Sequence, residues 1–326
     1  MVKPQVIGLG EMLWDCLADQ SGPQQRVQSW TRYPGGAPAN VVCALVRLGT
    51  PAAFIGCIGT DELGDALVAL LQQVGVNTTG IQRHATAPTR QIEVLRLPNG
   101  DRQFAGFRGG HAADFADAGL QASELPVELF DAAEYLVLGT LELAYPTTRR
   151  AIGRALDLAE QRYLKIFVDV NWRPMFWPQP DLAKPMIQEL VKQVDFLKLT
   201  TEEAQWLFDT TDPGVIAHRL GTIEGVLVTA GEQGCTYFLS ENQGFVPAFQ
   251  VEVADATGAG DGFVAGILHQ LIQRGIAALS HADTARAIVT YASAVGALTT
   301  TRNGAIAAQP TAAEVTAFLD LHPAFG

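Results

Sequence analysis

The chain has 326 residues, of which 48% are hydrophobic and 17% charged, so it can bury a large core without disulfide bonds. Its formal net charge of −12 disfavours binding to nucleic acid and to anionic membrane surfaces, which carry the same sign of charge. The four cysteines lie far apart with no CxxC pair, which predicts buried thiols in a reducing compartment rather than disulfides or a zinc site. The N-terminal apolar run is too short for a signal peptide or a membrane span, and we expect a cytoplasmic protein.

Short apolar runs alternate with amphipathic stretches through most of the chain. β-branched residues favour strands in the former, and apolar residues at a period of 3.6 favour helices in the latter. In chain order the sequence predicts a strand at 6–9, a helix at 39–48, a strand at 53–58, a helix at 63–74, a strand at 135–138, a helix at 147–160, strands at 166–170, 196–199 and 226–229, and helices at 263–274 and 284–298. This alternation is typical of a doubly wound α/β fold, in which helices cover both faces of a mostly parallel sheet.

Two stretches, about 13–33 and 91–107, break this alternation. In the second, Asn99-Gly100 separates two alternating runs as a hairpin turn does. These stretches predict a small antiparallel β flap, or lid, inserted into the core. Because the sequence shows no internal repeat and no linker-like change of composition, we expect a single domain over residues 1–326.

The strongest chemical signal is the segment 255–262, DATGAGDG, which is followed at once by an apolar helical pattern. The backbone N–H groups of Gly258, Ala259 and Gly260 can converge on an anion at the start of that helix. In the same turn, the Asp261 carboxylate is placed to take a proton from a hydroxyl group that attacks phosphorus. A simple helix cap explains one glycine and one Asp or Thr, but not three small residues between two carboxylates. We therefore predict a phosphoryl-transfer site with Asp261 as the base.

The motif DATGAGD resembles the C-terminal signature of the PfkB carbohydrate kinases, the family of ribokinase, fructokinase and adenosine kinase. The N-terminal signature of that family is matched by GGAPAN at 35–40, by Gly49 and by GTDELG at 59–64. The resemblance extends from Gly10-Glu11 to Ala305. It implies a ribokinase-like fold and an ATP-dependent sugar kinase.

Four residues near the N-terminus are candidates for binding the sugar. Gly35 and Gly36 leave backbone open to close approach by a ligand, and Asn40 offers both a donor and an acceptor to hydroxyl groups. A plain loop before a helix explains the same residues equally well, and only the resemblance favours binding. By the same resemblance Asp15 grips sugar hydroxyls from the lid, although an exposed strand aspartate is the simpler interpretation.

Two arginines, Arg108 and Arg173, resemble family arginines near the substrate, and each is equally consistent with a surface salt bridge. The segments GGAPAN, DVNWRP at 169–174 and LKLT at 197–200 are more similar to fructokinases than to ribokinases, so we expect phosphorylation of the 6-hydroxyl of D-fructose. The alternative substrate 2-keto-3-deoxygluconate carries a carboxylate, for which Arg96, Arg108 or Arg173 can supply the cation. A non-catalytic sugar-binding protein has no use for Asp261 or the glycine turn.

The resemblance also implies a nucleotide site, which it places at Lys198, Thr229, Gly231, Gly234, Gly258, Gly260 and Ser293. A plain β-turn is the alternative at 229–234. Glu203 matches the family glutamate that holds magnesium through water, although Thr200 replaces the usual Asn and the same residues fit a capping box. A potassium site is implied at oxygens around Asp255 and Thr257 and at carbonyls near Thr299, Arg302 and Gly304. Relatives often dimerise through the flap, so a homodimer is a further expectation.

Other nucleotide-binding and metal chemistries find little support. The first strand is followed by GLGEML, which lacks the third glycine of a dinucleotide-binding motif, and no Walker A sequence occurs. The six histidines are dispersed without the spacing of metal ligands. The partners that we expect are therefore a small sugar, ATP and Mg²⁺, with K⁺ implied by the family.

Overall fold

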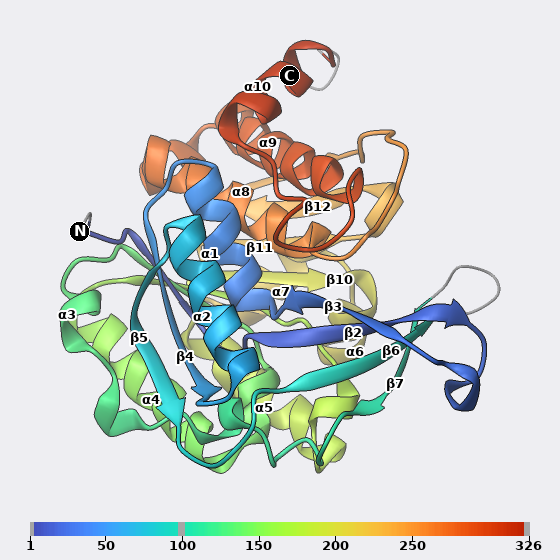
Figure 1. The fold of residues 1–326 in the computed structure, drawn as a ribbon. Helices are drawn as coiled ribbons and strands as arrows, with labels where there is room; N and C mark the ends of the chain where they lie inside the picture. The colour runs from blue at the N-terminus through green and yellow to red at the C-terminus, as the bar shows by residue number, and fades with distance from the viewer. Residues whose placement is uncertain (1–2, 97–101, 323–326) are drawn as a thin grey trace.

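The computed structural model describes residues 3–96 and 102–322, which form a nine-stranded sheet and a separate four-stranded sheet (Figure 1). The order of the large sheet is β13-β12-β11-β10-β9-β8-β1-β4-β5. All neighbouring strands from β11 to β5 run parallel, and β12 and β13 add an antiparallel edge. Its strands are β1 (Val6–Leu9), β4 (Ala52–Gly59), β5 (Asn77–His84), β8 (Tyr135–Leu138), β9 (Lys165–Asp169), β10 (Phe196–Thr200), β11 (Gly225–Thr229), β12 (Cys235–Leu239) and β13 (Asn242–Val246).

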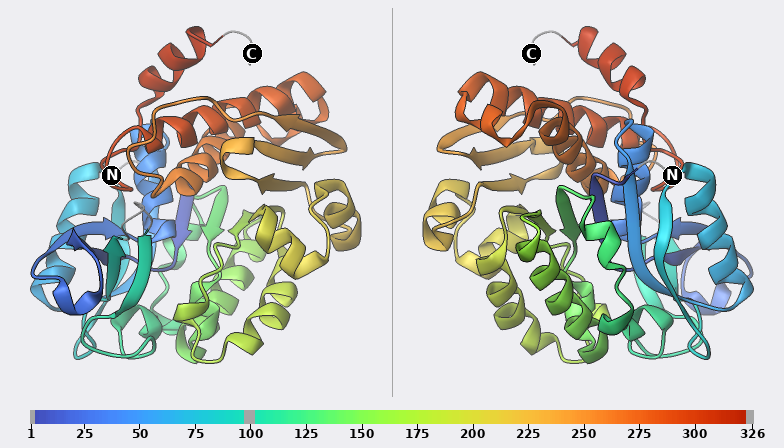
Figure 2. Two further views of the ribbon diagram at one scale, coloured as in Figure 1. Left: turned by 90° about the vertical axis from the view of Figure 1, so that its right-hand side faces the viewer. Right: turned by 90° about the vertical axis from the view of Figure 1, so that its left-hand side faces the viewer.

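Helices cover both faces of the large sheet because successive side chains of each strand point to opposite faces. Ile7 and Leu9 belong to one buried apolar cluster, whereas Val6 belongs to the other. The first cluster includes residues of α3 (Val127–Phe130), α4 (Pro146–Gln161), α5 (Ala183–Leu190), α6 (Thr201–Phe208) and α7 (Pro213–Leu220). The second includes residues of α1 (Ala37–Arg47), α2 (Glu62–Val74), α8 (Ala259–Arg274), α9 (Ala282–Thr300) and α10 (Ala312–Asp320). Figure 2 shows the sheet between these two layers, which confirms the doubly wound α/β fold.

The predicted elements are all present, with small differences at their ends. Strands β1 and β8 have the predicted bounds, and the other predicted strands agree to within one residue. The largest difference is at α8, which begins at Ala259 rather than at residue 263. The glycine turn therefore already forms the first turn of this helix, and Asp261 lies within it.

The small sheet has the order β3-β2-β6-β7, and its strands come from the two stretches that break the α/β alternation. These strands are β2 (Leu13–Ser21), β3 (Trp30–Gly35), β6 (Gln91–Arg96) and β7 (Arg102–Phe107). The outer pairs are antiparallel as predicted, but β2 and β6 run parallel at the centre of the sheet. The predicted turn at Asn99-Gly100 lies outside the described residues.

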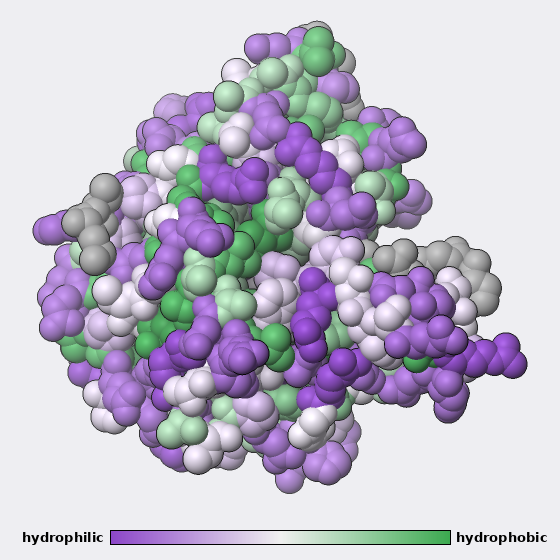
Figure 3. Space-filling view, viewed as in Figure 1, coloured by the Kyte–Doolittle hydropathy of each residue, from purple (hydrophilic) through white to green (hydrophobic). Residues whose placement is uncertain are grey.

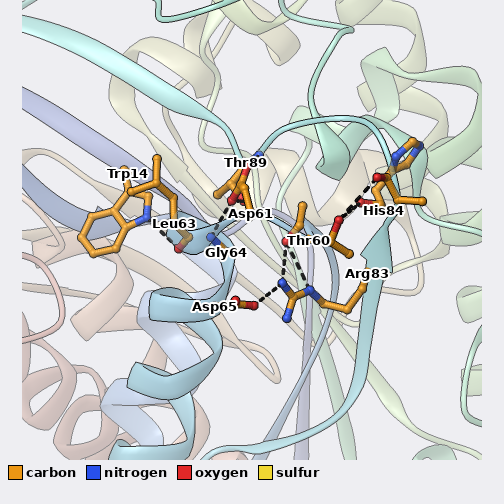
Figure 4. Close-up of polar contacts among 11 residues, drawn as sticks. Trp14, Thr60, Asp61, Leu63, Gly64, Asp65, Arg83, His84 and Thr89 are labelled. Carbon is orange, nitrogen blue, oxygen red and sulfur yellow. Dashed lines mark hydrogen bonds and ion pairs between the residues drawn. The ribbon is translucent and has the colours of Figure 1, made fainter.

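The small sheet is joined to the core beside the start of α2 (Figure 4). Trp14 Nε1 on β2 donates to the carbonyl of Leu63, at a distance of 3.1 Å. Asp61 caps α2 by accepting from the Gly64 N–H at 2.7 Å, and it also accepts from the N–H and the hydroxyl group of Thr89, each at 2.7 Å. One aspartate thus fixes the loop before α2 against the segment that leads into β6.

Two expectations from composition can be compared with the fold. The four cysteines are buried free thiols, as predicted. Within residues 3–96 and 102–322, no helix has the length and the apolar character needed to cross a bilayer.

Candidate active site

A cleft of about 1310 Å³ lies between the small sheet and the carboxyl ends of the parallel strands. In Figure 3 the surface is notched between the lobe that the small sheet forms and the upper part of the molecule. Residues that follow β1, β8, β9, β10 and β11 line the cleft, together with the start of α8. Open α/β sheets bind ligands at this edge, where the loops after the strands converge.

Asp261 lies in the cleft at the start of α8. Gly258 caps this helix with φ of 81°, and a Cβ at this position would lie 2.9 Å from Ala305, so the turn requires glycine. Asp261 Oδ2 accepts a hydrogen bond of 2.8 Å from Asn40 Nδ2, in the first turns of α1. The fold therefore brings the predicted base into contact with a predicted sugar-binding residue 221 positions earlier in the chain.

The carboxyl group of Asp261 is less acidic than an ordinary aspartate. Burial raises its pKa, and the Asp169 charge adds to this, while Asn40, Lys198 and Arg173 lower it, with a net pKa of about 6. A base with this pKa is ionised at neutral pH and still retains affinity for a proton. Both properties suit general-base catalysis.

A buried ion pair lies next to Asp261. Strands β9 and β10 pair in parallel with Asp169 directly opposite Lys198, so the two side chains point to the same face of the sheet. Lys198 Nζ donates to both carboxylate oxygens of Asp169, at 3.0 and 3.1 Å. Burial lowers the pKa of Lys198, but the charges of Asp169 and Glu203 outweigh it, so the net shift is upward and the ammonium stays protonated. Sequence analysis selected Lys198 but missed Asp169, which only the strand register identifies.

Most of the predicted sugar-binding residues near the N-terminus line the cleft. Asp15, Gly36 and Asn40 line it, whereas Gly35 packs behind Asp15, where a Cβ would lie 2.5 Å from Asp15 Oδ2. Gly36 has φ of 107°, and a Cβ there would lie 2.4 Å from the Glu11 carbonyl oxygen. These two glycines let the loop before α1 pass close to β2.

The predicted arginines have different environments. Arg173 lines the cleft and donates to the Trp172 carbonyl at 2.9 Å. Arg108 does not line it; its Nε donates to Glu93 at 2.8 Å and its guanidinium lies 5.4 Å from the Trp30 ring centroid. The structure thus gives Arg108 the salt bridge that was the alternative interpretation. The side chain of Arg96 lies outside the described part of the chain.

The predicted nucleotide residues also line the cleft, namely Lys198, Thr229, Gly231, Gly234, Ser293 and the glycine turn. Glu203 also lines it and forms the capping box of α6 with Thr200. Its two carboxylate oxygens accept from the Trp172 and Thr200 N–H groups, at 2.6 and 2.8 Å. A carboxylate has lone pairs beyond these two bonds, so a water ligand of a metal ion fits beside it.

Among the predicted potassium-site residues, Asp255, Thr257 and Gly304 are in contact, and the side chains of Thr299 and Arg302 are bonded elsewhere. Asp255 accepts from the Thr257 hydroxyl at 2.7 Å and from the Gly304 N–H at 3.1 Å, and all three residues line the cleft. The side chain of Thr299 is buried against Gln309 at 3.0 Å, and Arg302 pairs with Glu314 at 2.5 Å. Neither of these two residues lines the cleft.

Glu11 and Glu142 form a second pair of buried carboxyl groups, which sequence analysis did not select. Glu11 lines the cleft, is only 2% exposed and accepts from the Ala37 N–H at 2.8 Å. Burial raises the pKa of Glu11 to about 7 and that of Glu142 well above its usual range, and the proximity of Glu11 raises the latter further. Glu11 could have been selected because the Gly10-Glu11 dipeptide follows the first strand, whereas Glu142 belongs to no motif in the sequence.

Comparison with known proteins assigns the family. The sequence model of the pfkB family carbohydrate kinases matches residues 3–312. The chain belongs to this family. The carbohydrate kinase is 34% identical over 323 residues to a probable fructokinase-2 of Arabidopsis thaliana, covering 98% of this chain and 97% of that protein.

Solved structures of similar proteins agree with this assignment. The carbohydrate kinase resembles fructokinase with bound ATP from Xylella fastidiosa, with a TM-score of 0.89, 29% identity and coverage of 99% of this chain and 100% of that chain. It also resembles a double mutant of fructokinase from Vibrio cholerae O395 with bound fructose, ADP and potassium ion, with a TM-score of 0.84, 28% identity and coverage of 97% and 98%. The ribokinase-like fold and the assignment as a carbohydrate kinase are therefore confirmed.

Proposed function

We propose that this carbohydrate kinase transfers the γ-phosphoryl group of ATP to the 6-hydroxyl of D-fructose, with Asp261 as the general base. The observation that carries this proposal is the position of Asp261, in the first turn of α8 and bonded to Asn40 within the cleft. Similarity to fructokinases, including structures with bound ATP and with bound fructose and ADP, supports the choice of both substrates.

In the proposed reaction Asp261 accepts the proton of the sugar hydroxyl as its oxygen attacks the γ-phosphorus. A bond forms between that oxygen and phosphorus, the bond from phosphorus to the β–γ bridging oxygen breaks, and ADP leaves. The N–H groups at the start of α8 face the charge that develops on the phosphoryl oxygens. Asp15, Gly36 and Asn40 hold the sugar, and the small sheet acts as a lid that excludes water.

Magnesium fits this arrangement beside Glu203, whose carboxylate has room for a metal-bound water and lies in the cleft. When bound with the nucleotide, Mg²⁺ neutralises charge on the transferring phosphates. A potassium ion fits the oxygen atoms of Asp255 and Thr257 in the same way. Thr299 and Arg302 contribute at most their backbone carbonyls, because their side chains are already bonded elsewhere.

The test is ADP release with Mg–ATP and a panel of fructose, ribose, glucose, adenosine and 2-keto-3-deoxygluconate, with and without potassium. We expect selective turnover of fructose, and preference for the keto acid would instead assign the carboxylate to Arg173, the predicted arginine that lines the cleft. Asp261→Asn should lower kcat by roughly 10²- to 10⁴-fold and leave fructose affinity within a few-fold. Asp283→Asn, at an exposed position of α9, is the matched control. Near-normal turnover of folded Asp261→Asn protein contradicts the assignment of the base.

A further inference from the structure

The strongest feature that the proposed mechanism leaves unused is the buried pair of Lys198 and Asp169. Both residues are only 5% exposed, and both line the cleft. Their neighbours along β9 and β10 are apolar core residues, so both charges carry a desolvation cost. A pair that served stability alone could be replaced by apolar side chains at little cost, which points to a role at the site.

The position of the ammonium group suggests what this role is. A Cβ built on Gly260 would lie 3.2 Å from Lys198 Nζ, so the ammonium lies directly against the glycine turn. Asp169 occupies two of its three N–H donors, and within the described residues no third hydrogen bond is formed. One donor and a full positive charge therefore remain beside the turn in which Asp261 lies.

We infer that Lys198 is a catalytic residue that bonds the transferring phosphoryl group, and that Asp169 is the positioning residue that holds it there. This inference rests on the proposed phosphoryl transfer and adds a cation supplied by the protein. During transfer, charge is spread over the oxygens of the γ-phosphoryl group, and a lysine in a site with little water stabilises this charge strongly. Lys198 keeps its proton throughout, so the bonds made and broken and the proton taken by Asp261 are as described above.

The charges around the site allow a test whose expected result differs from the result expected if Lys198 had a purely structural role. The ionisable groups that act on Asp261 are Asp169 on β9, Lys198 on β10 and Arg173 after β9. Glu203 on α6 and Cys235 on β12 face Lys198 in turn. Since Lys198 lowers the pKa of Asp261 and Asp169 raises it, removing each charge moves the acid limb of the pH profile in opposite directions.

The experiment compares Lys198→Met, Asp169→Asn and the double variant with Lys165→Met. Lys165 begins β9 at the opposite edge of the same sheet and pairs with Asp195 at 2.7 Å, so it is a matched lysine outside the cleft. The double variant removes both members of the pair, so neither is left buried opposite a neutral partner, which protects the test against misfolding. Each protein is assayed for kcat and KM across pH 5 to 9, and for binding of Mg–ATP and Mg–ADP by calorimetry.

If the inference holds, Lys198→Met and the double variant lose roughly 10²- to 10³-fold in kcat, with the KM for fructose within about threefold. Lys198→Met should also bind ATP roughly tenfold more weakly while ADP binding changes little. Its acid limb should move to higher pH, and that of Asp169→Asn to lower pH. On the alkaline side, Asp169→Asn should lose activity at a lower pH than the wild type does, because without the charge of Asp169 burial lowers the pKa of Lys198.

The inference is overturned if folded Lys198→Met protein matches Lys165→Met in kcat and in ATP affinity, or if both single variants shift the acid limb in the same direction. Binding separates this result from failure of the proposed function. If the wild-type protein does not turn over fructose but the Lys198→Met variant still loses selectivity for ATP over ADP, the proposed substrate is refuted and the role of Lys198 is retained.

Discussion

Arg90 and Asp117 form an ion pair whose side chains are 0% and 3% exposed, the most buried pair in the described part of the chain. Arg90 precedes β6 and Asp117 lies in the short 3₁₀ turn Ala116–Gly119. Arg90 Nε and Nη2 donate to the two oxygens of Asp117, at 2.6 and 2.7 Å. The guanidinium lies 4.7 to 5.4 Å from the ring centroids of Phe107, Phe115, Tyr145 and Phe176.

Replacing Arg90 with methionine should destabilise the protein strongly. The substitution leaves the charge of Asp117 buried without a partner, which costs about 3–5 kcal/mol. The Ala112 carbonyl also loses a donor at 2.8 Å. Against a typical free energy of unfolding of about 5–15 kcal/mol, this loss is a large fraction of the total. Because the Arg90 carbonyl accepts from the Trp14 N–H at 3.0 Å, the damage falls where the small sheet joins the core.

Urea unfolding followed by both tryptophan fluorescence and circular dichroism measures the loss, provided that the two transitions coincide. The variant Arg90→Met/Asp117→Leu removes both charges of this pair, so it should recover at least about 2 kcal/mol relative to Arg90→Met. Lys192→Met is the control, because it breaks an exposed pair with Glu189 and should cost less than about 1 kcal/mol. A loss below about 1 kcal/mol in Arg90→Met, or a double variant no more stable than the single one, refutes the reasoning.

Three further predictions concern Glu11, Gly36 and the Asp61 cap of α2. Because the pKa of Glu11 is raised in the folded state, its protonation contributes stability that is fully present below about pH 4.5 and is lost as pH rises through about 7. In urea unfolding, the free energy of unfolding of Glu11→Gln should therefore rise relative to that of the wild type between about pH 4.5 and 8. Gly36→Ala places a Cβ at a φ of 107° against Glu11, so the free energy of unfolding should fall by about 1–3 kcal/mol and the KM for the sugar should rise. Asp61→Ala removes the α2 cap, and a thermal scan should show a loss of about 0.5–2 kcal/mol without a change in nucleotide affinity.

Local sequence patterns were sufficient to predict the fold class and the central strands of the large sheet. Apolar periodicity located six of the nine strands of the large sheet and the helices α1, α2, α4, α8 and α9, because burial of their side chains depends on residues close in sequence. It did not predict the remaining strands β5, β12 and β13. The glycine turn before α8 was equally clear, since φ of 81° at Gly258 is a local requirement. The parallel pairing of β2 with β6 was not predicted, because these strands are distant in sequence and no turn joins them.

The environments of the charged residues could not be predicted in this way. Arg108 and Arg173 are equally polar in the sequence, yet one pairs with Glu93 and the other lines the cleft. Glu142 carries no local signal, since its proximity to Glu11 arises from the order of β8 and β1 in the sheet. Side chains of this kind are identified only when the pairing of non-adjacent segments is known.

Some of the buried charges lie together at the cleft, whereas the Arg90–Asp117 pair does not line it. Asp169 and Lys198 lie at the carboxyl edge of the sheet, and Glu11 lines the same cleft. Each buried charge costs several kcal/mol unless it is paired, and pairs of this kind seldom add to stability. The two large apolar clusters on either side of the sheet supply the stability that offsets this cost. Under the proposed function, the buried charges that line the cleft lie where a phosphoryl group and a sugar hydroxyl would meet, and there they would act on the reaction as well as on the fold.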